Sequence, residues 1–346
     1  MNEPFLSVII PMRNERGWIE RCLGSVLAQD WPSNRMEVLV ADGLSDDGSA
    51  ELLAEIACRD PRVIVVENPD RIVPGGLNRA IRKARGTIIV RVDAHTVLEP
   101  EYMRLGAEIL ERTGAHNVGG PMVCLGGGPV GDAIAGAMSS RFGIGATFHF
   151  AEHEEECDTV YMGMWPLRVL ADVGLFDEEL VRNQDDELSY RIRKAGGRIF
   201  VSPAMRSSYQ NRESWKALLS QFYQYGVWKV RVLQKHPGQM SLRHFVPPAF
   251  QAAIVGGVLA GVFHWGFAAL AVGFVLGYLA CMGVVAWREA MPGKRLRLWF
   301  AFMVIHHSWA AGFWVGLVRF AGRWFEPESE PPGLEVASVE KPYAGS

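Results

Sequence analysis

Carboxylate and imidazole side chains follow directly after short apolar runs in the first hundred residues. Asp42 follows the run Glu37–Ala41, and Asp93 and His95 follow the run Thr87–Val92. An Asp at the end of a strand can accept hydrogen bonds from a nucleobase N–H or from ribose hydroxyls. A carboxylate and an imidazole two residues apart lie on the same side of an extended segment and can together hold a divalent cation that bridges two phosphates. These residue types therefore indicate a site for a nucleoside diphosphate.

The same side chains also have purely structural interpretations. A helix cap would use Asp46, Asp47 or Ser49, whereas Asp42 comes too early in the segment to act as a cap. An Asp-x-His sequence at the end of a strand is also common in turns. If Asp93 and His95 hold a cation, the imidazole favours Mn²⁺ over Mg²⁺.

The apolar runs themselves predict the framework that positions these residues. The runs are β-branched, do not alternate with polar residues and are separated by segments of helical length, which is typical of a parallel sheet covered on both faces. Right-handed crossovers bring the carboxyl ends of such strands to one edge, where ligands bind. The expected strands are Leu6–Pro11, Glu37–Ala41, Val63–Glu67 and Thr87–Val92, and the expected helices are Gly17–Ala28, Ala50–Cys58 and Gly76–Ala84.

The first of these strands is followed by a segment that is more polar than a structural turn requires. It contains Pro11, Arg13, Asn14 and Glu15. Because it ends at the same edge of the sheet as Asp42, we expect these four residues to contact the same ligand.

A further cluster of carboxylates lies much later in the chain. Asp185, Asp186 and Glu187 come just before the helical pattern Leu188–Ala195. One of them could take the proton from an attacking hydroxyl, since a carboxylate within hydrogen-bond reach can act as a general base. The alternative is that all three only cap the helix, where acidic side chains suit the helix dipole.

The composition limits the class of protein and of partner. The chain has 346 residues, enough for one large domain plus an accessory region. Its formal net charge of -3, from 35 basic and 38 acidic residues, gives no reason to expect nucleic acid as a partner. Its five cysteines are widely spaced and include no Cys-x-x-Cys pair, which argues against a disulfide framework and favours a reducing compartment.

The character of the chain changes near residue 240. Before that point short apolar runs alternate with charged segments, whereas residues 247–320 are almost entirely apolar. We predict a catalytic domain over residues 1–240, a membrane region over 247–320 and a disordered tail over 326–346. The segment Met1–Arg13 lacks the apolar core of a signal peptide, so the first domain is expected in the cytoplasm.

The membrane region contains two or three candidate transmembrane helices. Pro247–Trp265 and Gly266–Trp287 contain no Asp, Glu, Lys or Arg, and each approaches the ~20 residues that cross a bilayer. The loop that follows is basic and should be cytoplasmic, which predicts a multi-pass protein of the inner (cell) membrane. The third stretch, Leu298–Val318, either crosses or lies partly in the interface, because Arg319 and Arg323 at its far end disfavour an external location.

Two other features have two interpretations each. The segment Glu213–Lys235 alternates aromatic and basic side chains, which fits an interfacial helix or a helix packed in the core. His306 and His307, in the third apolar stretch, could contact a lipid diphosphate or make hydrogen bonds between helices.

Four segments, in this order along the chain, resemble the signatures of a known family. They read VIIPMRNE, VLVADGLSDDGS, RVDAH and NQDDELSYR, and they are similar to those of the family 2 glycosyltransferases, which have the GT-A fold. The last two, together with QYGVWKVRVL, most closely resemble the exopolysaccharide glycosyltransferases of the succinoglycan biosynthesis type. The resemblance extends from about Leu6 to about Val232. It implies an α/β domain of the GT-A type with a mostly parallel sheet, followed by C-terminal transmembrane helices.

The resemblance also implies roles for individual residues. In an inverting transferase that uses a nucleoside-diphosphate sugar, Asp42 would contact the nucleoside, Asp93 the metal and the diphosphate, and Asp185 would be the base. To the residues that contact the nucleotide sugar we add Asn78.

The sequence departs from the family pattern at three motifs. The usual Asp-x-Asp reads Asp93-Ala94-His95, and the usual Glu-Asp pair reads Gln184-Asp185. The common Gln-x-x-Arg-Trp element is replaced by residues 221–225, which favours the addition of one sugar per visit over processive synthesis.

These features together predict a membrane enzyme that transfers a hexose, with UDP-glucose as the expected donor, to a lipid-linked saccharide. The process would be exopolysaccharide or cell-surface polysaccharide synthesis, with Mn²⁺ or Mg²⁺ as cofactor. The alternative is a non-catalytic membrane scaffold or sugar-binding protein derived from a glycosyltransferase. The retention of Asp42, Asp93 and Asp185 together argues against that alternative.

Overall fold

The computed structural model describes residues 3–144, 150–326 and 331–334. Contacts within the chain divide it into two compact units, each made of segments that are separate in sequence. The first unit contains Met1–Gly120, His153–Met205 and Ser329–Ser346, and the second contains Pro121–Glu152 and Arg206–Glu328.

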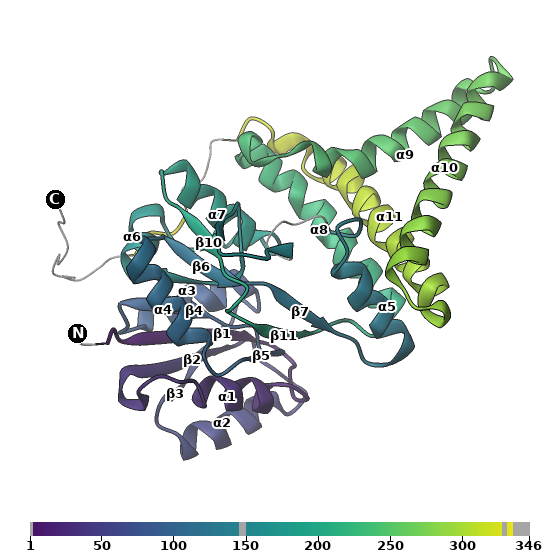
Figure 1. The fold of residues 1–346 in the computed structure, drawn as a ribbon. Coiled ribbons are helices and arrows are strands. Elements are labelled where there is room, and N and C mark those ends of the chain that lie inside the picture. The colour runs from purple at the N-terminus through teal and green to yellow at the C-terminus, as the bar shows by residue number, and fades with distance from the viewer. Residues whose placement is uncertain (1–2, 145–149, 327–330, 335–346) are drawn as a thin grey trace. The chain divides into compact units, whose positions relative to one another are not determined.

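The first unit is built on an eight-stranded sheet with the order β3-β2-β1-β4-β9-β6-β10-β8 (Figure 1). Strand β1 is parallel to β2 and β4 on either side, and β2 is parallel to β3, whereas β9 runs antiparallel to β4 and β6. The predicted mostly parallel sheet is thus confirmed. The strands are β1 (Leu6–Met12), β2 (Met36–Asp42), β3 (Val63–Glu67), β4 (Ile88–Arg91), β6 (Asn117–Gly120), β8 (Glu155–Glu156), β9 (Tyr161–Pro166) and β10 (Ile199–Val201).

The helices of the first unit lie between these strands in the expected order. Nearly every side chain of β1 and β2 is buried, which requires packing on both faces of the sheet. The third predicted helix begins at Val73 and not at Gly76, because Pro74 is favourable in a first helical turn. The helices are α1 (Ile19–Leu27), α2 (Ser49–Arg59), α3 (Val73–Lys83), α4 (Tyr102–Thr113), α6 (Leu167–Val173) and α7 (Gln184–Lys194), and a short strand, β5 (Thr96–Leu98), follows β4.

The second unit is mainly helical. Its strands β7 (Met122–Leu125) and β11 (Ser207–Gln210) pair in parallel. Its helices are α5 (Gly128–Met138), α8 (Trp215–Lys235), α9 (Leu242–Ala260), α10 (Trp265–Glu289) and α11 (Arg295–Arg319).

Helices α8 and α11 pack so closely that glycine is needed at their contact. A Cβ atom added at Gly312 would lie 2.0 Å from the main-chain oxygen of Tyr223, and one added at Gly316 would lie 2.6 Å from that of Val227. On the α8 side, a Cβ at Gly226 would lie 2.1 Å from the main-chain oxygen of Trp309. Small residues allow two helix backbones to approach in this way. The segment Glu213–Lys235 is thus packed against another helix, in agreement with the packing interpretation.

Two helices of the second unit are long and apolar enough to cross a membrane among the residues that the structure describes. They are Trp265–Glu289, which is α10, and Pro292–Arg319, which contains α11. The expected first span Pro247–Trp265 does not coincide with one helix. Helix α9 begins earlier, at Leu242, and ends at Ala260, where the chain turns. Most of the predicted tail, 326–346, lies outside the described residues. Within it, the main-chain oxygen of Pro332 accepts a hydrogen bond of 2.9 Å from the N–H of Leu175.

Candidate functional site

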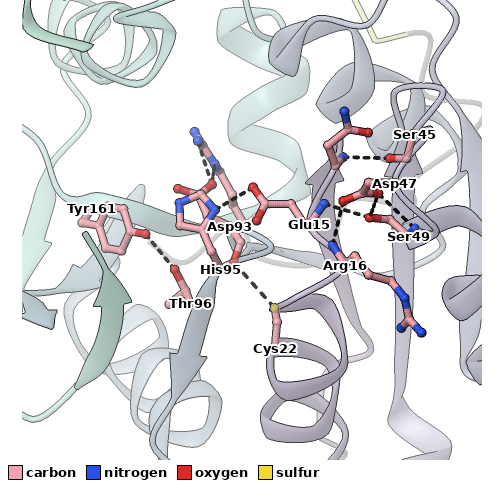
Figure 2. A network of polar contacts seen from close by, with 12 residues as sticks. Glu15, Arg16, Cys22, Ser45, Asp47, Ser49, Asp93, His95, Thr96 and Tyr161 are labelled. Carbon is pink, nitrogen blue, oxygen red and sulfur yellow. Dashed lines mark hydrogen bonds and ion pairs between the residues drawn. The ribbon is translucent and has the colours of Figure 1, made fainter. Parts of the chain in front are cut away.

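The polar segments after β1, β2 and β4 meet at one edge of the sheet, because the three strands are neighbours and parallel. The side chain of Asn14 donates to Asp46 Oδ1 at 2.8 Å, which joins the first segment to the second. On its other side, Glu15 Oε1 lies 3.0 Å from Nδ1 of His95, which joins the first segment to the third. Figure 2 shows Glu15 between His95 and the pair Asp47 and Ser49. The predicted meeting of the strand ends is confirmed.

Asp42 ends β2 and shapes the loop that follows it. Its carboxylate accepts hydrogen bonds from the hydroxyl of Ser45 at 2.6 Å and from the N–H of Ser45 at 3.3 Å. The same hydroxyl accepts the N–H of Asn14 at 2.9 Å. Leu44 adopts a left-handed backbone with φ of 56°, an unfavourable conformation for a non-glycine residue that the surrounding loop maintains. Asp42 therefore fixes the shape of the edge of the site.

Asp47 and Ser49 lie at the start of α2, but neither is the predicted helix cap, because the N-cap position is occupied by Gly48, which has a left-handed φ of 88°. Asp47 accepts the N–H of Ser49, the first residue of α2, at 3.0 Å and also accepts its hydroxyl. Those bonds, led by the one from the Ser49 hydroxyl, lower the pKa of the exposed Asp47 carboxyl. The hydroxyl of Ser49 in turn accepts the N–H of Glu15 at 2.8 Å. The first residue of α2 thus also positions Glu15.

Asp93 and His95 lie together after β4, at the side of a buried arginine. Arg91 Nη2 and Nε donate to Asp93 Oδ1 at 3.0 and 3.1 Å, and the side chain of Arg91 is 5% exposed. Burial by itself would raise the pKa of the Asp93 carboxyl, but the charges of Arg91 and His95 outweigh it, so the pKa lies below its ordinary value. Asp93 is therefore a carboxylate near neutral pH, as a cation ligand must be.

Neutral side chains, among them Cys22 and Tyr161, lie beside Asp93 and His95. The thiol of Cys22 donates to the main-chain oxygen of Asp93 at 3.5 Å, and the hydroxyl of Tyr161 lies 2.8 Å from that of Thr96 (Figure 2). Burial raises the pKa of the Cys22 thiol, so this cysteine stays protonated and serves as a packing residue.

Asp185 belongs to the first turn of α7, and Arg91 connects it to the same group. Arg91 Nη1 donates to Asp185 Oδ1, and the side chain of Asp185 is 36% exposed. The helix begins at Gln184, so Asp185 lies inside the helix and not at its cap. Arg91 is not among the residues that the sequence predicts for the site. The available signal was a charged residue at the end of the apolar run Ile88–Arg91, since a buried arginine needs an anionic partner.

The other two carboxylates of this turn differ from Asp185. Glu187 is 1% exposed and forms a bidentate pair with Arg191 at 2.6 and 2.9 Å. Arg191 also donates to the main-chain oxygens of Gly174 and Leu175, at 3.0 and 2.6 Å. Glu187 thus anchors α7 to the loop before it. The side chain of Asp186 is partly exposed.

The other residues that are predicted to contact the nucleotide sugar differ in how deeply they are buried. Asn78 is fully buried in α3, where its amide donates to the main-chain oxygen of Phe176 at 2.8 Å and accepts the N–H of Phe176 at 3.0 Å. These bonds hold the loop before α7, so any effect of Asn78 on the ligand would be indirect. Pro11 is partly buried in β1, and Arg13 is exposed just beyond that strand.

The two histidines of α11 connect helices of the second unit. His306 Nδ1 lies 2.9 Å from the hydroxyl of Tyr278, and its Nε2 lies 2.9 Å from the main-chain oxygen of Phe142. The side chain of Gln251 donates to the main-chain oxygen of His307 at 3.2 Å. These contacts match the prediction of hydrogen bonds between helices.

The sequence is similar to known proteins over most of its length. The model of the family described as glycosyl transferase family 2 matches residues 7–151. The succinoglycan biosynthesis protein ExoA of Rhizobium meliloti (strain 1021) is 32% identical over 328 residues, which cover 91% of this chain and 96% of that protein. The dolichyl N-acetyl-alpha-D-glucosaminyl phosphate 3-beta-D-2,3-diacetamido-2,3-dideoxy-beta-D-glucuronosyltransferase of Methanococcus voltae is 25% identical over 266 residues, 75% of this chain and 82% of that protein.

A solved structure supports the same fold. The mannosyltransferase PcManGT from Pyrobaculum calidifontis, in complex with GDP-Man and Mn²⁺, matches with a TM-score of 0.58 at 19% identity, over 92% of this chain and 88% of that chain. The fold of the sheet domain is therefore GT-A-like. Since ExoA matches almost the whole chain and the family model covers the segments that contain Asp42 and Asp93, the chain belongs to glycosyl transferase family 2 and is a glycosyltransferase.

Proposed function

We propose that this glycosyltransferase is an inverting hexosyltransferase, with UDP-glucose as its donor and a lipid-linked saccharide as its acceptor. The product would contribute to an exopolysaccharide or another cell-surface polysaccharide. The names of ExoA and of the Methanococcus voltae transferase, which refer to succinoglycan biosynthesis and to a dolichyl phosphate-linked sugar, support this class of acceptor. The complex of PcManGT with GDP-Man supports a nucleoside-diphosphate sugar as donor.

The observation that carries the proposal is the position of Arg91 between Asp93 and Asp185. The two carboxylates are far apart along the chain, yet one buried guanidinium contacts both. An inverting transfer needs a group that stabilises the departing diphosphate and a base for the acceptor hydroxyl, and the two must act on one anomeric carbon. The shared contact with Arg91 supports the assignment of these two roles to Asp93 and Asp185.

The nucleoside would bind beside Asp42 at the edge formed by the ends of β1 and β2. Asp42 is held by Ser45 and faces the same segment that contains Arg13 and Asn14. A carboxylate there can accept hydrogen bonds from ribose hydroxyls or a base N–H. The exposed guanidinium of Arg13 can add a contact to phosphate or base.

Asp93 and His95 suit a divalent cation that the substrate helps to bind. No group of three or more His, Cys, Asp or Glu side chains suited to a metal occurs among residues 3–144, 150–326 and 331–334. Cations of this kind are commonly held by one or two protein side chains together with substrate phosphates, so the pair fits. When bound, Mn²⁺ or Mg²⁺ would neutralise charge on the diphosphate as it leaves.

Asp185 would accept the proton of the acceptor hydroxyl. It is partly exposed at the start of α7, whereas its neighbour Glu187 is buried and already paired with Arg191. Arg91 holds one oxygen of Asp185 and so fixes the direction in which the carboxylate faces. General-base catalysis of this kind contributes about 10²–10⁴-fold to a rate.

The apolar helices support a membrane location. We place the protein in the inner (cell) membrane as a multi-pass protein, with the catalytic domain in the cytoplasm, where nucleotide sugars are available. Among the described residues, two helices support membrane association by their length and hydropathy.

The test is transfer of label from a panel of radiolabelled UDP- and GDP-sugars into lipid extract by membranes that contain the protein. Wild type, Asp185→Asn and Asp186→Asn would be compared, with EDTA and then with added Mn²⁺ or Mg²⁺. Label from UDP-glucose in lipid with wild type and Asp186→Asn, but not with Asp185→Asn, would support the donor, the acceptor class and the base. Transfer from another donor would change only the assignment of UDP-glucose as donor. Absence of transfer from every donor would favour the non-catalytic alternative.

A further inference from the structure

The two helices that could span a membrane bury very different shares of their apolar stretch. The share is 11% in α10 and 44% in α11. Between Arg243 and Arg288 the chain contains no Asp, Glu, Lys or Arg, yet α9 and α10 expose many large apolar side chains, among them Val258, Leu259 and Leu270. An exposed apolar surface of this kind indicates a partner that is itself apolar.

Helices α9 and α10 form an antiparallel hairpin that widens toward α11 (Figure 1). Near the turn, a Cβ atom at Gly257 of α9 would lie 2.9 Å from the Cβ of Ala271 in α10. The hairpin therefore closes tightly at the end that is far from α11.

The other ends of the hairpin stand at two separate points on α11. The ring of Phe245 in α9 lies 5.9 Å from that of Phe313, whereas Trp299 donates to the main-chain oxygen of Leu279 in α10 at 3.1 Å. Phe313 and Trp299 are about 21 Å apart along the helix at its usual rise per residue. Helix α11 thus lies across the base of the hairpin.

Helix α8 runs beside α11 in the same direction and also crosses the base of the hairpin. At their beginnings, the rings of Trp215 and Phe300 lie 5.0 Å apart. At their ends, Gln234 donates to the main-chain oxygen of Phe320 at 2.8 Å. Any depth that α11 takes in a membrane is therefore also the depth of α8.

The side chains of α8 are unsuitable for the interior of a bilayer. Lys229 is buried in the protein, where it donates to Gln239 at 3.0 Å, and Arg231 pairs with Glu326 at 3.0 Å. A crossing α11 would take this charged network into the membrane, where charges are costly. It would also place the non-helical turn 261–264 in the hydrocarbon, although backbone groups there need internal partners.

A hairpin that points into the bilayer, with α11 at the surface, keeps both the charged network of α8 and the turn 261–264 out of the hydrocarbon. If the hairpin points into the bilayer, its turn reaches the far interface, where the adjacent Trp265 is favourable, and α8 and α11 lie at the near surface. The 19 residues of α9 span about 28 Å, close to the ~30 Å of hydrocarbon in a bilayer. The basic residues Arg243, Arg288 and Arg295 then lie at the near headgroups.

We infer that the α9–α10 hairpin alone crosses the lipid bilayer and that α11, although apolar enough to span, lies with α8 on the face from which the hairpin enters. The inference rests on the membrane location in the proposed function, but it requires no catalytic activity. The exposed apolar side chains of α9 and α10 would then contact the acyl chains of the bilayer.

The test is the labelling of single cysteines in the full-length protein with a membrane-impermeant maleimide, in right-side-out and inverted vesicles. The background would carry Cys58→Ser and Cys281→Ser, which removes the exposed thiols. Burial raises the pKa of the thiols of Cys22, Cys124 and Cys157, so these react slowly. The three reporter positions are highly exposed: Met291→Cys before α11, Val318→Cys at its end and Val262→Cys at the turn of the hairpin.

We expect Met291→Cys and Val318→Cys to react from one face and Val262→Cys from the opposite face. Reaction of Val318→Cys from the face opposite to Met291→Cys would show that α11 crosses and would overturn the inference. Reaction of Val262→Cys from the face of Met291→Cys, or from neither face, would show that the hairpin does not cross. Transfer activity measured in the same vesicles reports on the proposed function separately, since loss of activity with the expected labelling would leave the topology intact.

Discussion

The guanidinium of Arg91, at the end of β4, donates a hydrogen bond to Asp185, 94 residues later in the first turn of α7. The same guanidinium donates twice to Asp93. One buried cation thus balances two carboxylates that have different proposed roles. Because the planar guanidinium has donors in fixed directions, it sets the relative positions of both carboxylates, which a point charge would not do.

Replacing Arg91 should therefore impair turnover more than donor binding. We expect Arg91→Met to lower kcat by about 10²-fold or more, because a misplacement of about 1 Å in a catalytic group has effects of this size. Arg91→Lys should retain an intermediate kcat, since a lysine keeps the charge but not the two-sided geometry. The measurement is kcat and KM for the donor, together with the thermal unfolding temperature.

A suitable control for this prediction is Arg79→Met. Arg79 pairs with Asp70 at 2.8 Å, but both side chains are more than 40% exposed, and pairs of this kind contribute about 0–1 kcal/mol. The control should leave kcat and stability unchanged. A folded Arg91→Met variant with the kcat of wild type would contradict the role of Arg91.

The buried pair Glu187 and Arg191 should support stability and not the chemical step. We expect Glu187→Gln to lower the free energy of unfolding by about 3–5 kcal/mol, because breaking one side of a buried pair leaves an uncompensated charge. The matched control is Glu55→Gln, whose pair with Arg59 has the same spacing in a helix but is about two-thirds exposed. Chemical unfolding measures both, and equal small effects would contradict the structural role of Glu187.

The low pKa of Asp93 predicts a specific dependence of stability on pH. Since the pKa is lower in the folded state than its ordinary value of 3.8, the ionised form favours folding. This contribution is complete above the unfolded-state pKa and is lost as the pH falls through the lower folded-state pKa. The free energy of unfolding of Asp93→Asn should therefore fall less steeply than that of wild type below about pH 4. Identical slopes for the two proteins would contradict the assignment.

His95 should determine which cation supports transfer. We expect His95→Asp to lower activity with Mn²⁺ relative to activity with Mg²⁺, because carboxylates suit Mg²⁺ and imidazole suits Mn²⁺. The new carboxylate would also face Glu15, 3.0 Å from the present imidazole, so the variant should need more cation for half-maximal activity. The measurement is activity during Mn²⁺ and Mg²⁺ titration after EDTA. His116→Asn, which alters a histidine bonded to the N–H of Arg198, is the control and should keep the wild-type ratio.

The sequence was sufficient to predict the framework of the site. Uninterrupted β-branched runs identify strands that are buried on both faces, and the polar residues that follow them must then meet at one edge. The contact between Glu15 and His95 agrees with this reasoning. Helix ends were less accurate, as at Val73, because the first turn of a helix depends on local capping that the apolar pattern does not encode.

Contacts between distant segments were not predictable in this way. The pairing of Arg91 with Asp185 depends on how α7 packs against the sheet, which a strand-end argument does not specify. The bonds of Asn78 to Phe176 likewise depend on a loop 98 residues away. In the second unit, hydropathy alone makes α10 and α11 similar, and the difference between them is visible only in what each one packs against.

The close approach of α8 and α11 predicts which glycines tolerate a side chain. A Cβ at Gly312 would lie 2.0 Å from the main-chain oxygen of Tyr223, and backbone cannot move aside as a flexible side chain can. We expect Gly312→Ala to destabilise the second unit by about 1–3 kcal/mol, as overpacking of a close contact does. Gly277→Ala in α10 is the control, because a Cβ there would meet no atom within 4 Å. Thermal unfolding in detergent and protease cleavage within residues 206–326 would measure both. Equal stability of the two variants would show that the helices can separate at Gly312 and would contradict the prediction.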